Sequence, residues 1–211
     1  MHIRLFLAFA AIAAASLVVP ATAAPVASIS ASSLIRPGDQ ILGNPNGQIT
    51  IVDFYDTSCM PCRAMNRRIE RLIAHDPEIR YVPVDLPILG AQSVLGARAL
   101  VAAGMQGKSS AMQGLLMRQT RLPTMAVLRA DATTIGLNVA RFERDLVSPA
   151  VARVVDGNLR RGAALGIHYV PVVYVGRNRI PGSVNYHDLQ WLVRHAHQRL
   201  VTWVAPGHSP S

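Results

Sequence analysis

The sequence predicts an α/β protein in which an all-helical insertion divides a covered sheet into two parts. Residues 49–55 form an almost continuously apolar run, which is typical of a strand buried on both faces. Residues 88–162 then show helical spacing of apolar residues together with helix-capping residues. Strand-like runs return at 170–175 and 179–181. The sheet is therefore expected to be completed only after the helical stretch.

The composition favours one globular unit. The chain has 211 residues, half of them hydrophobic, which is enough for one core with an inserted piece. Its formal charge is +9, and Lys108 is its only lysine. The arginines are dispersed, which indicates a solvated surface rather than a patch that attracts anionic membranes or acidic partners. With few aromatic residues and no recognition motif, nucleic acid is not an expected partner.

The start of the chain has the pattern of a cleaved export signal. His2 and Arg4 precede an apolar run over 5–19, and small residues follow up to Ala23. The run is alanine-rich and shorter than a membrane-spanning helix needs. Cleavage after Ala23 would leave an N-terminal arm at 24–42 ahead of the globular part. The pattern predicts an exported mature protein in an oxidising compartment, in which cysteine pairs persist.

The chain has only two cysteines, Cys59 and Cys62, and both follow the apolar run at 49–55. The residues at 56–58 favour a turn and a helix cap, and an amphipathic helix is expected from there to about Ala74. A helix N-terminus offers free N–H groups and a partial positive charge that stabilise a thiolate. Cys59, closer to that terminus, is therefore the expected nucleophile, and Cys62 is the expected resolving thiol.

Other roles for the cysteine pair stay open at this point. A bridge that encloses about four residues would stabilise a large domain little, because this stabilisation grows with loop length. Structural zinc needs four ligands, and the chain has no second cysteine pair. Thiolates with Met60 could hold Cu(I), and a peptide-binding chaperone with a vestigial dithiol is a further alternative. Helical spacing predicts core packing for most other methionines, namely Met65, Met105, Met112, Met117 and Met125.

The remaining elements are expected in the following order. Residues 80–86 form a second strand, although Pro83 argues for a sheet edge or a break. Helices follow at 93–103, from Ser109 or Ser110 to 117, at 123–132, from Asn138 to 146 and from Ser148 toward 162 or 166. The returning strands come next, and a final amphipathic helix begins at Asn185 and extends to Leu200.

Together these segments resemble the DsbA-like thiol-disulfide oxidoreductases of the thioredoxin fold, including their periplasmic Com1 and ScsC-type relatives. The resemblance covers about 43–199 and is carried by the segments 52–62, 86–90, 136–138 and 165–171. It implies a thioredoxin-like domain formed by 43–87 and 163–205, with 88–162 inserted as a helical domain. It also implies that Cys59 and Cys62 exchange disulfides with exported proteins in the periplasm.

Asp53 lies six residues before Cys59, where proteins of this kind place a buried acid beneath the disulfide. Burial of a carboxylate raises its pKa, and such a group can relay protons during thiol exchange. An aspartate at the strand end that reaches solvent is the alternative. The relay interpretation predicts that Asp53→Ala slows the attack or release of Cys62 and leaves alkylation of Cys59 largely intact.

Pro171 is another residue whose role the resemblance implies. Its peptide bond with Val170 is expected to be cis and to face the cysteines, with the Val170 backbone available to pair with an extended substrate. An ordinary proline at the first position of a strand is the alternative. Met60, Pro61 and Tyr169 complete the expected substrate-binding residues, and Tyr169 stands where relatives often have glycine.

The direction of exchange stays open between oxidase, reductase and isomerase. The pair Met60-Pro61 lacks the histidine that strongly oxidising relatives often carry, and Pro61 is similar to reducing thioredoxins. Val170 before Pro171 instead resembles the oxidising proteins, which favours an oxidase. A membrane redox partner is expected to recycle the dithiol, and no metal or organic cofactor is required. The assembly state is open.

Overall fold

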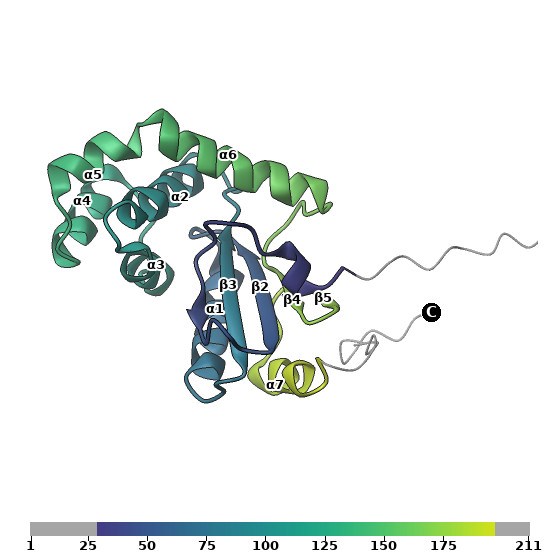
Figure 1. Ribbon diagram of the computed structural model, residues 1–211. Helices are drawn as coiled ribbons and strands as arrows, with labels where there is room; N and C mark the ends of the chain where they lie inside the picture. The colour runs from purple at the N-terminus through teal and green to yellow at the C-terminus, as the bar shows by residue number, and fades with distance from the viewer. Residues whose placement is uncertain (1–28, 197–211) are drawn as a thin grey trace, which may run out of the picture.

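A mixed sheet lies at the centre of residues 29–196, the part of the chain that the computed structural model describes (Figure 1). Within this part the sheet has five strands in the order β1-β3-β2-β4-β5, and only β2 and β3 are parallel. The predicted export signal and the end of the predicted last helix lie outside the described residues. The strands are β1 (Leu42–Gly43), β2 (Ile49–Tyr55), β3 (Ile79–Asp85), β4 (Val172–Val175) and β5 (Asn178–Pro181).

Helical elements cover both faces of the sheet, which explains why every residue of β2 is buried. Three of these elements are α1 (Met60–Ile73), α7 (Tyr186–Arg194) and the 3-10 helix η1 (Ala31–Leu34). The helices α1 and α7 pack on the face that carries Ile51 of β2, and η1 packs on the face that carries Phe54. Side chains alternate between the two faces along a strand, so a strand covered on both faces is apolar throughout.

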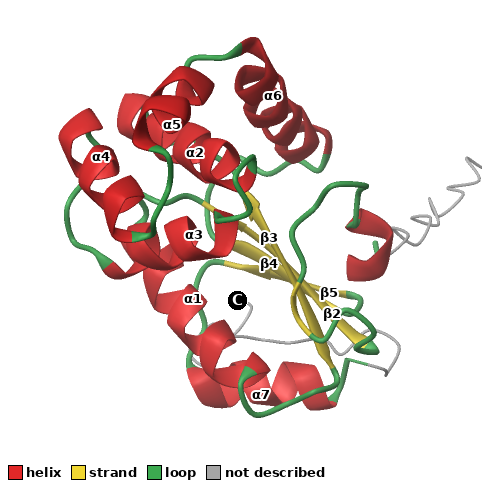
Figure 2. Ribbon diagram, turned by 60° about the vertical axis from the view of Figure 1, so that its left-hand side comes forward, coloured by secondary structure: helices red, strands yellow, loops and turns green. Residues whose placement is uncertain are grey.

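Between β3 and β4, the described chain forms five helices that lie together at one end of the sheet (Figures 1 and 2). They are α2 (Ala91–Gly104), α3 (Ser109–Arg118), α4 (Met125–Thr134), α5 (Val139–Leu146) and α6 (Pro149–Ala164). Their apolar side chains share a core cluster with Tyr55, Cys59 and Cys62. The predicted helical insertion is confirmed. The cysteine pair lies where the core of the insertion meets the sheet.

Polar side chains cap most of the predicted helix starts. Asn138, Ser148 and Asn185 each accept a hydrogen bond from a backbone N–H in the first turn of α5, α6 and α7. The helix predicted at 123–132 begins at Met125, because Thr124 provides the cap. The local capping pattern therefore places these helix starts to within about two residues.

The predicted serine cap of α3 is wrong. Lys108 stands at the N-cap position and makes no side-chain cap bond. The hydroxyl of Ser109 donates instead to Gln40 Oε1 at 2.8 Å, and the hydroxyl of Ser110 accepts from Gln40 Nε2 at 2.6 Å. A contact with the N-terminal arm thus uses both hydroxyl groups, and the capping preference of serine gives no sign of such a distant partner.

The strand β3 continues through Pro83 without a break. Pro83 pairs in register with Asp53 of β2, whereas β1 pairs only with Arg80 and Tyr81 on the other side of β3. Pro83 therefore lies beyond the end of β1, at an edge where the ladder needs no N–H group. The predicted edge is confirmed, and the alternative of a break is wrong.

Not all of the methionines predicted to pack in the core do so. Met65, Met112 and Met117 are buried, whereas Met105 is 43% exposed and Met125 is 41% exposed. Met105 follows the last residue of α2, and Met125 is the first residue of α4. Both positions lie at helix ends, where a regular helical spacing no longer fixes the direction of the side chain.

An arm at 29–41 runs along the face of the sheet opposite α1 and contacts both parts of the fold (Figure 1). The Ala31 N–H donates to the carbonyl oxygen of Gly176, at the turn between β4 and β5, at 2.6 Å. Arg161 of α6 donates to both carboxylate oxygens of Asp39, at 3.0 and 3.1 Å. The arm therefore ties the insertion to the sheet.

Candidate functional site

The cysteine pair lies at the start of α1 and is closed as a disulfide. Cys59 is the N-cap residue, and its Sγ accepts a hydrogen bond from the Cys62 N–H at 3.1 Å. Cys59 is 4% exposed and Cys62 is fully buried. Pro61 lies in the first turn, where backbone N–H groups have no partner inside the helix, so it removes no helical bond. After reduction, this helix N-terminus would stabilise a thiolate at Cys59.

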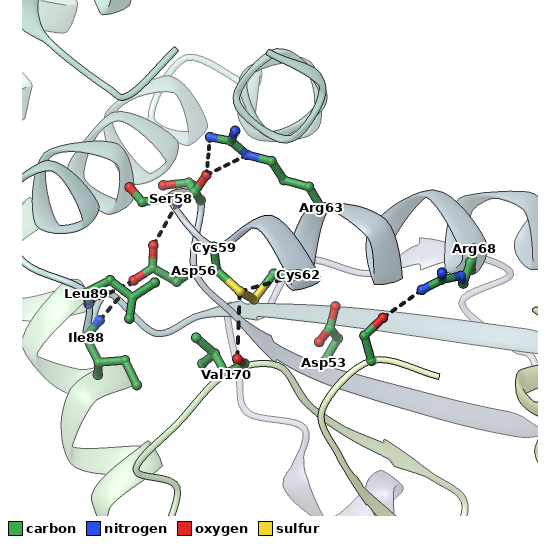
Figure 3. The surroundings of a disulfide bond; sticks show 12 residues. Asp53, Asp56, Ser58, Cys59, Cys62, Arg63, Arg68, Ile88, Leu89 and Val170 are labelled. Carbon is green, nitrogen blue, oxygen red and sulfur yellow. Dashed lines mark hydrogen bonds between the residues drawn. A yellow bond between two sulfur atoms is a disulfide. The ribbon is translucent and has the colours of Figure 1, made fainter. Parts of the chain in front are cut away.

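A loop distant in sequence lies beside the disulfide (Figure 3). The Val170–Pro171 peptide bond is cis, as the family resemblance implies. The carbonyl oxygen of Val170 lies 3.7 Å from Cys59 Sγ. Pro171 is buried, whereas Val170 is half-buried. The backbone of this loop is therefore among the first groups that a polypeptide approaching Cys59 would meet.

The other predicted substrate-binding residues lie on the surface. Met60 is 77% exposed, Tyr169 is 47% exposed, and Pro61 is exposed as well. Met60 and Pro61 stand between the cysteines, and Tyr169 directly precedes Val170. Exposed apolar side chains on two sides of an almost buried sulfur offer contact area to a peptide.

Asp53 is buried completely on β2, on the strand beneath α1 (Figure 3). The Tyr81 hydroxyl donates to its Oδ2 at 3.3 Å, and its Oδ1 has no hydrogen-bond partner among the described residues. Burial raises the pKa of Asp53 from 3.8 to about 7, and the hydrogen bond from Tyr81 acts in the opposite direction. The group can therefore exchange a proton near neutral pH.

A second aspartate holds the loop before Cys59, although in the sequence it looks like an ordinary turn former. Asp56 is buried completely. Its Oδ1 accepts from the Ser58 N–H at 2.7 Å, and its Oδ2 accepts from the Ile88 and Leu89 N–H groups at 3.1 and 3.2 Å (Figure 3). No local sequence pattern predicts the hydrogen bond between Asp56 and Ile88, which are 32 positions apart.

Arg63 fixes the same loop from the other side. Its Nε and one terminal nitrogen donate to the carbonyl oxygen of Thr57, at 3.1 and 2.8 Å. Arg63 is buried, contrary to the expectation that the arginines form a solvated surface. Burial lowers the pKa of Arg63, and the negative charge of Asp56 acts in the opposite direction. A positive charge one residue after Cys62 favours thiolate formation in the pair.

Asp85 is a third buried acid near the loop, and the sequence analysis did not single it out. Neither carboxylate oxygen has a hydrogen-bond partner among the described residues. Burial, and then the negative charge of Asp56, raise the pKa of Asp85 well above its usual range. The Thr57 N–H lies near enough to act in the opposite direction but makes no full hydrogen bond with the carboxylate. Asp85 also lines a cavity of about 450 Å³ beneath Gln40 of the arm. That cavity is not lined by either cysteine.

The sequence left open a Cu(I) site at Cys59, Cys62 and Met60. In the structure the two sulfur atoms are bonded to each other, and the Met60 side chain is largely exposed. Within residues 29–196, no group of three or more histidine, cysteine, aspartate or glutamate side chains is arranged to hold a metal ion. The copper interpretation stays a prediction, which copper titration of the reduced protein tests.

Comparison with known proteins finds the same fold. A family model described as thioredoxin matches residues 36–195. A thioredoxin-like oxidoreductase from Silicibacter pomeroyi DSS-3 is 32% identical, with a TM-score of 0.72 over 78% of this chain and 95% of that chain. The thiol-disulfide exchange protein α-DsbA2 from Wolbachia pipientis is 22% identical, with a TM-score of 0.69 over 74% of this chain and 86% of that chain.

A curated relative is a different kind of protein. The Na⁺/H⁺ antiporter NhaA of Herminiimonas arsenicoxydans is 32% identical over 146 residues, which are 69% of this chain and 23% of the antiporter. The chain spans about a quarter of the length of the curated relatives that it matches. Among residues 29–196, the helices are too short or too polar to cross a membrane.

Proposed function

Since the chain belongs to the thioredoxin family, we propose that it is a DsbA-like thiol-disulfide oxidoreductase, which exchanges disulfides with exported proteins in the periplasm. We propose further that the net direction is oxidation of the substrate. Cys59 is the nucleophile and Cys62 the resolving thiol in this proposal. Reduction or isomerisation of substrate disulfides by the same residues is the alternative.

The position of the Cys59 sulfur is the observation that carries the proposal. It caps α1, it lies 3.7 Å from the Val170 carbonyl oxygen, and it retains some exposure while Cys62 has none. An attacking thiolate from solvent therefore reaches Cys59 first. The N–H of Cys62 already points at the Cys59 sulfur, so a thiolate that forms there is stabilised without rearrangement.

In the proposed reaction, a substrate thiolate attacks Cys59 Sγ, and the Cys59–Cys62 bond breaks as the new S–S bond forms. Cys62 leaves with the electron pair and takes up a proton. A second substrate thiolate then attacks the substrate sulfur of the mixed disulfide, and Cys59 leaves as a thiolate. The substrate loses two electrons and the protein gains them. A membrane redox partner would remove these electrons before the next cycle.

We assign the proton exchange of Cys62 to Asp53. The carboxyl group lies on the strand beneath α1, among the residues that surround the disulfide (Figure 3), and its pKa of about 7 suits proton transfer near neutral pH. Asp53→Ala should slow the attack or release of Cys62 and leave alkylation of Cys59 largely unchanged. Exchange kinetics with the wild-type pH dependence in this variant would contradict the assignment.

Substrate contacts in this proposal come from both sides of the cysteine pair. The Val170 backbone before the cis bond of Pro171 would pair with an extended peptide, and Met60, Pro61 and Tyr169 would contact its side chains. Their exposure beside an almost buried sulfur supports this assignment. The bulk of Tyr169 would restrict the groove near Pro171.

The equilibrium reduction potential of the Cys59–Cys62 pair tests the proposed direction. The pair is equilibrated in graded glutathione buffers, and its redox state is read by trapping free thiols. A potential near about −120 mV is expected for a disulfide donor, whereas a value near about −270 mV would mark a reductase. Cys62→Ser should accumulate a mixed disulfide with a peptide that carries a disulfide, because Cys59 attacks one sulfur of that bond and the other leaves as a thiolate, and the matched variant Cys59→Ser should not. A pair that exchanges with neither glutathione nor the peptide would overturn the proposed activity.

The periplasmic location rests on the charged, apolar and small-residue pattern at 1–23. This segment lies outside the described residues, so its test is biochemical. The chain purified from a periplasmic fraction should begin directly after Ala23. A protein that keeps its first residues in the membrane fraction would contradict the location.

A further inference from the structure

The carboxylate of Asp56 connects two segments that are far apart in the sequence. One oxygen binds the N–H of Ser58, the residue before Cys59, and the other binds the N–H groups of Ile88 and Leu89 (Figure 3). Ile88 and Leu89 lie in the connection that leads from β3 into α2, the first helix of the insertion. One buried side chain thus holds the cysteine loop and the entrance of the insertion together.

This use of an aspartate exceeds what a turn requires. An aspartate that stabilises a turn needs one side-chain oxygen for a backbone N–H two residues ahead. Asp76 makes that simple contact, since its Oδ1 accepts from the Glu78 N–H at 2.9 Å. Asp56 makes the same contact to Ser58 and has a second oxygen for the distant segment. Its complete burial leaves water unable to replace either contact.

The rest of the cysteine loop offers little freedom. The Cys59 N–H donates to the carbonyl oxygen of Asp56 at 3.1 Å, and Arg63 holds the carbonyl oxygen of Thr57. On the insertion side, a Cβ at position 96 of α2 would lie 2.3 Å from the Thr57 hydroxyl, so α2 packs closely against the loop. A shift of the insertion would therefore be transmitted to Cys59.

We propose that Asp56 is a positioning residue of the redox site, which ties the cysteine loop to the entrance of the insertion so that both hold one arrangement toward a polypeptide substrate. The inference rests on the proposed disulfide exchange with polypeptides. A small reagent needs only the Cys59 sulfur, whereas a polypeptide also has to fit the surface that the loop and the insertion form together. Loss of the Asp56 carboxylate should therefore affect the two reactions differently.

The variant Asp56→Asn tests this role with little change in shape. An amide has one acceptor oxygen and one donor nitrogen, so it can keep the Ser58 contact or the Ile88 and Leu89 contacts, but not both. Removal of a negative charge near Cys59 also favours the thiolate. Alkylation of reduced Cys59 by iodoacetamide should therefore stay the same or become faster. Disulfide exchange with a dithiol peptide should become about tenfold slower.

Amide hydrogen exchange provides a readout that does not depend on activity. In Asp56→Asn, the exchange rate should rise by about tenfold on the side that the amide does not keep, which is either Ser58 or the pair Ile88 and Leu89. Asp76→Asn is the matched control, because it also replaces a carboxylate by an amide, but among the described residues the Asp76 side chain binds only the nearby Glu78 N–H. Its peptide exchange, its alkylation and the amide rates at 58, 88 and 89 should equal those of the wild type.

The outcomes separate this inference from the proposed function. A wild-type protein that fails to exchange disulfides with the peptide would overturn the proposed function and, with it, the substrate part of the inference. The amide exchange rates would still test whether Asp56 connects the cysteine loop to residues 88–89. Equal peptide exchange in Asp56→Asn and the wild type would overturn the inference alone. A parallel loss of alkylation and peptide exchange, or amide exchange at wild-type rates on both sides, would also overturn it.

Discussion

At the residue scale, Asp53 and Asp85 are the two carboxyl groups whose protonation burial controls most strongly. Asp53 keeps one hydrogen bond, from Tyr81, and Asp85 has none among the described residues. Desolvation is the first cause of the raised pKa in both cases. A buried acid of this kind stores a proton at a pH where an exposed aspartate is ionised. The folded protein therefore binds protons that the unfolded chain releases.

The pH dependence of stability should report this difference for Asp53. Its pKa rises from 3.8 to about 7 on folding, so stability falls as the pH increases between those values. Above that range the buried charge costs on the order of 4 kcal/mol. Asp53→Asn removes the titration, and its free energy of unfolding should exceed that of the wild type by a growing margin from about pH 4 to about pH 7.

Denaturant unfolding of the oxidised proteins at a series of pH values measures this margin. The difference at the acidic end gives the cost of the amide itself, because Asp53 is protonated there in both folded and unfolded chains. A margin that does not depend on pH would mean that the carboxyl group of Asp53 does not titrate between about 4 and 7 in the folded protein.

Tyr81 should lower the midpoint of the Asp53 titration. Its hydroxyl donates to Asp53 at 3.3 Å and so favours the ionised carboxylate. Tyr81→Phe removes this donor, and the pKa of Asp53 should move above about 7. Carbon-detected NMR titration of the Asp53 carboxyl carbon measures the shift directly. A midpoint that moves downward would contradict the assigned direction of this hydrogen bond.

At the element scale, close packing of α6 against Leu86, the residue that follows β3, depends on a glycine. A Cβ at Gly162 would lie 2.6 Å from a methyl carbon of the buried Leu86, whereas a Cβ at Gly157 of the same helix would meet nothing within 4 Å. Gly162→Ala should therefore destabilise the protein by about 1–3 kcal/mol through overpacking. Gly157→Ala should stabilise it by about 0.5–1 kcal/mol, because alanine favours a helix interior.

Urea unfolding of the two glycine variants under the same conditions decides the point. The pair shares one helix and one chemical change, so a difference in sign isolates the contact with Leu86. Equal effects of the two substitutions would mean that Leu86 moves aside without cost and that the close approach has no energetic consequence.

Elements that depend on neighbouring residues could be predicted from the sequence. Elements that depend on contacts with residues far away in the sequence could not. The apolar run of β2 and the caps at Asn138, Ser148 and Asn185 depend on neighbours a few residues away, which the sequence displays. The hydroxyl groups at the start of α3 instead bind Gln40 of the arm. Capping preference is only one of the interactions that compete for a hydroxyl group.

The candidate site divides in the same way. Cys59 and Cys62 could be placed because a thiol pair at a helix start has a recognisable spacing, and Val170 and Pro171 because the family resemblance locates them. Asp56 could not be recognised, since its partners at 88–89 are brought close only by the pairing of β2 with β3. Composition likewise gave no sign of the buried arginines, Arg63 and Arg161.

At the scale of the whole molecule, one buried charge connects the arm to the insertion. Arg161 is 1% exposed, donates to Asp39 and to the carbonyl oxygen of Leu34, and lies over the ring of Phe54. A guanidinium in such surroundings depends on its partner, because an unpaired charge in the interior is unfavourable. The contact joins α6, the sheet and the arm in one place.

Asp39→Asn should therefore destabilise the whole protein by about 3–5 kcal/mol, since it leaves the Arg161 charge without its carboxylate. Thermal or urea unfolding measures the loss, and faster amide exchange at Ala31 would locate it in the arm. Glu143→Gln makes the same change in the exposed pair with Arg129, whose guanidinium side chain is 58% exposed. It should cost about 1 kcal/mol or less. Equal losses of unfolding free energy in the two variants would contradict the larger contribution expected for the buried pair of Arg161 and Asp39.

The connectivity of the sheet also has a consequence for how the chain can be rebuilt. Phe54 of β2 pairs with Val84 of β3 on one side and with Val172 of β4 on the other, so the chain leaves the sheet and returns to it at the same end. The two strand ends are separated by two strand spacings, about 10 Å. A few residues could span that gap. The helical part is thus a cassette between closely spaced attachment points, and its length can change without altering the register of the strands.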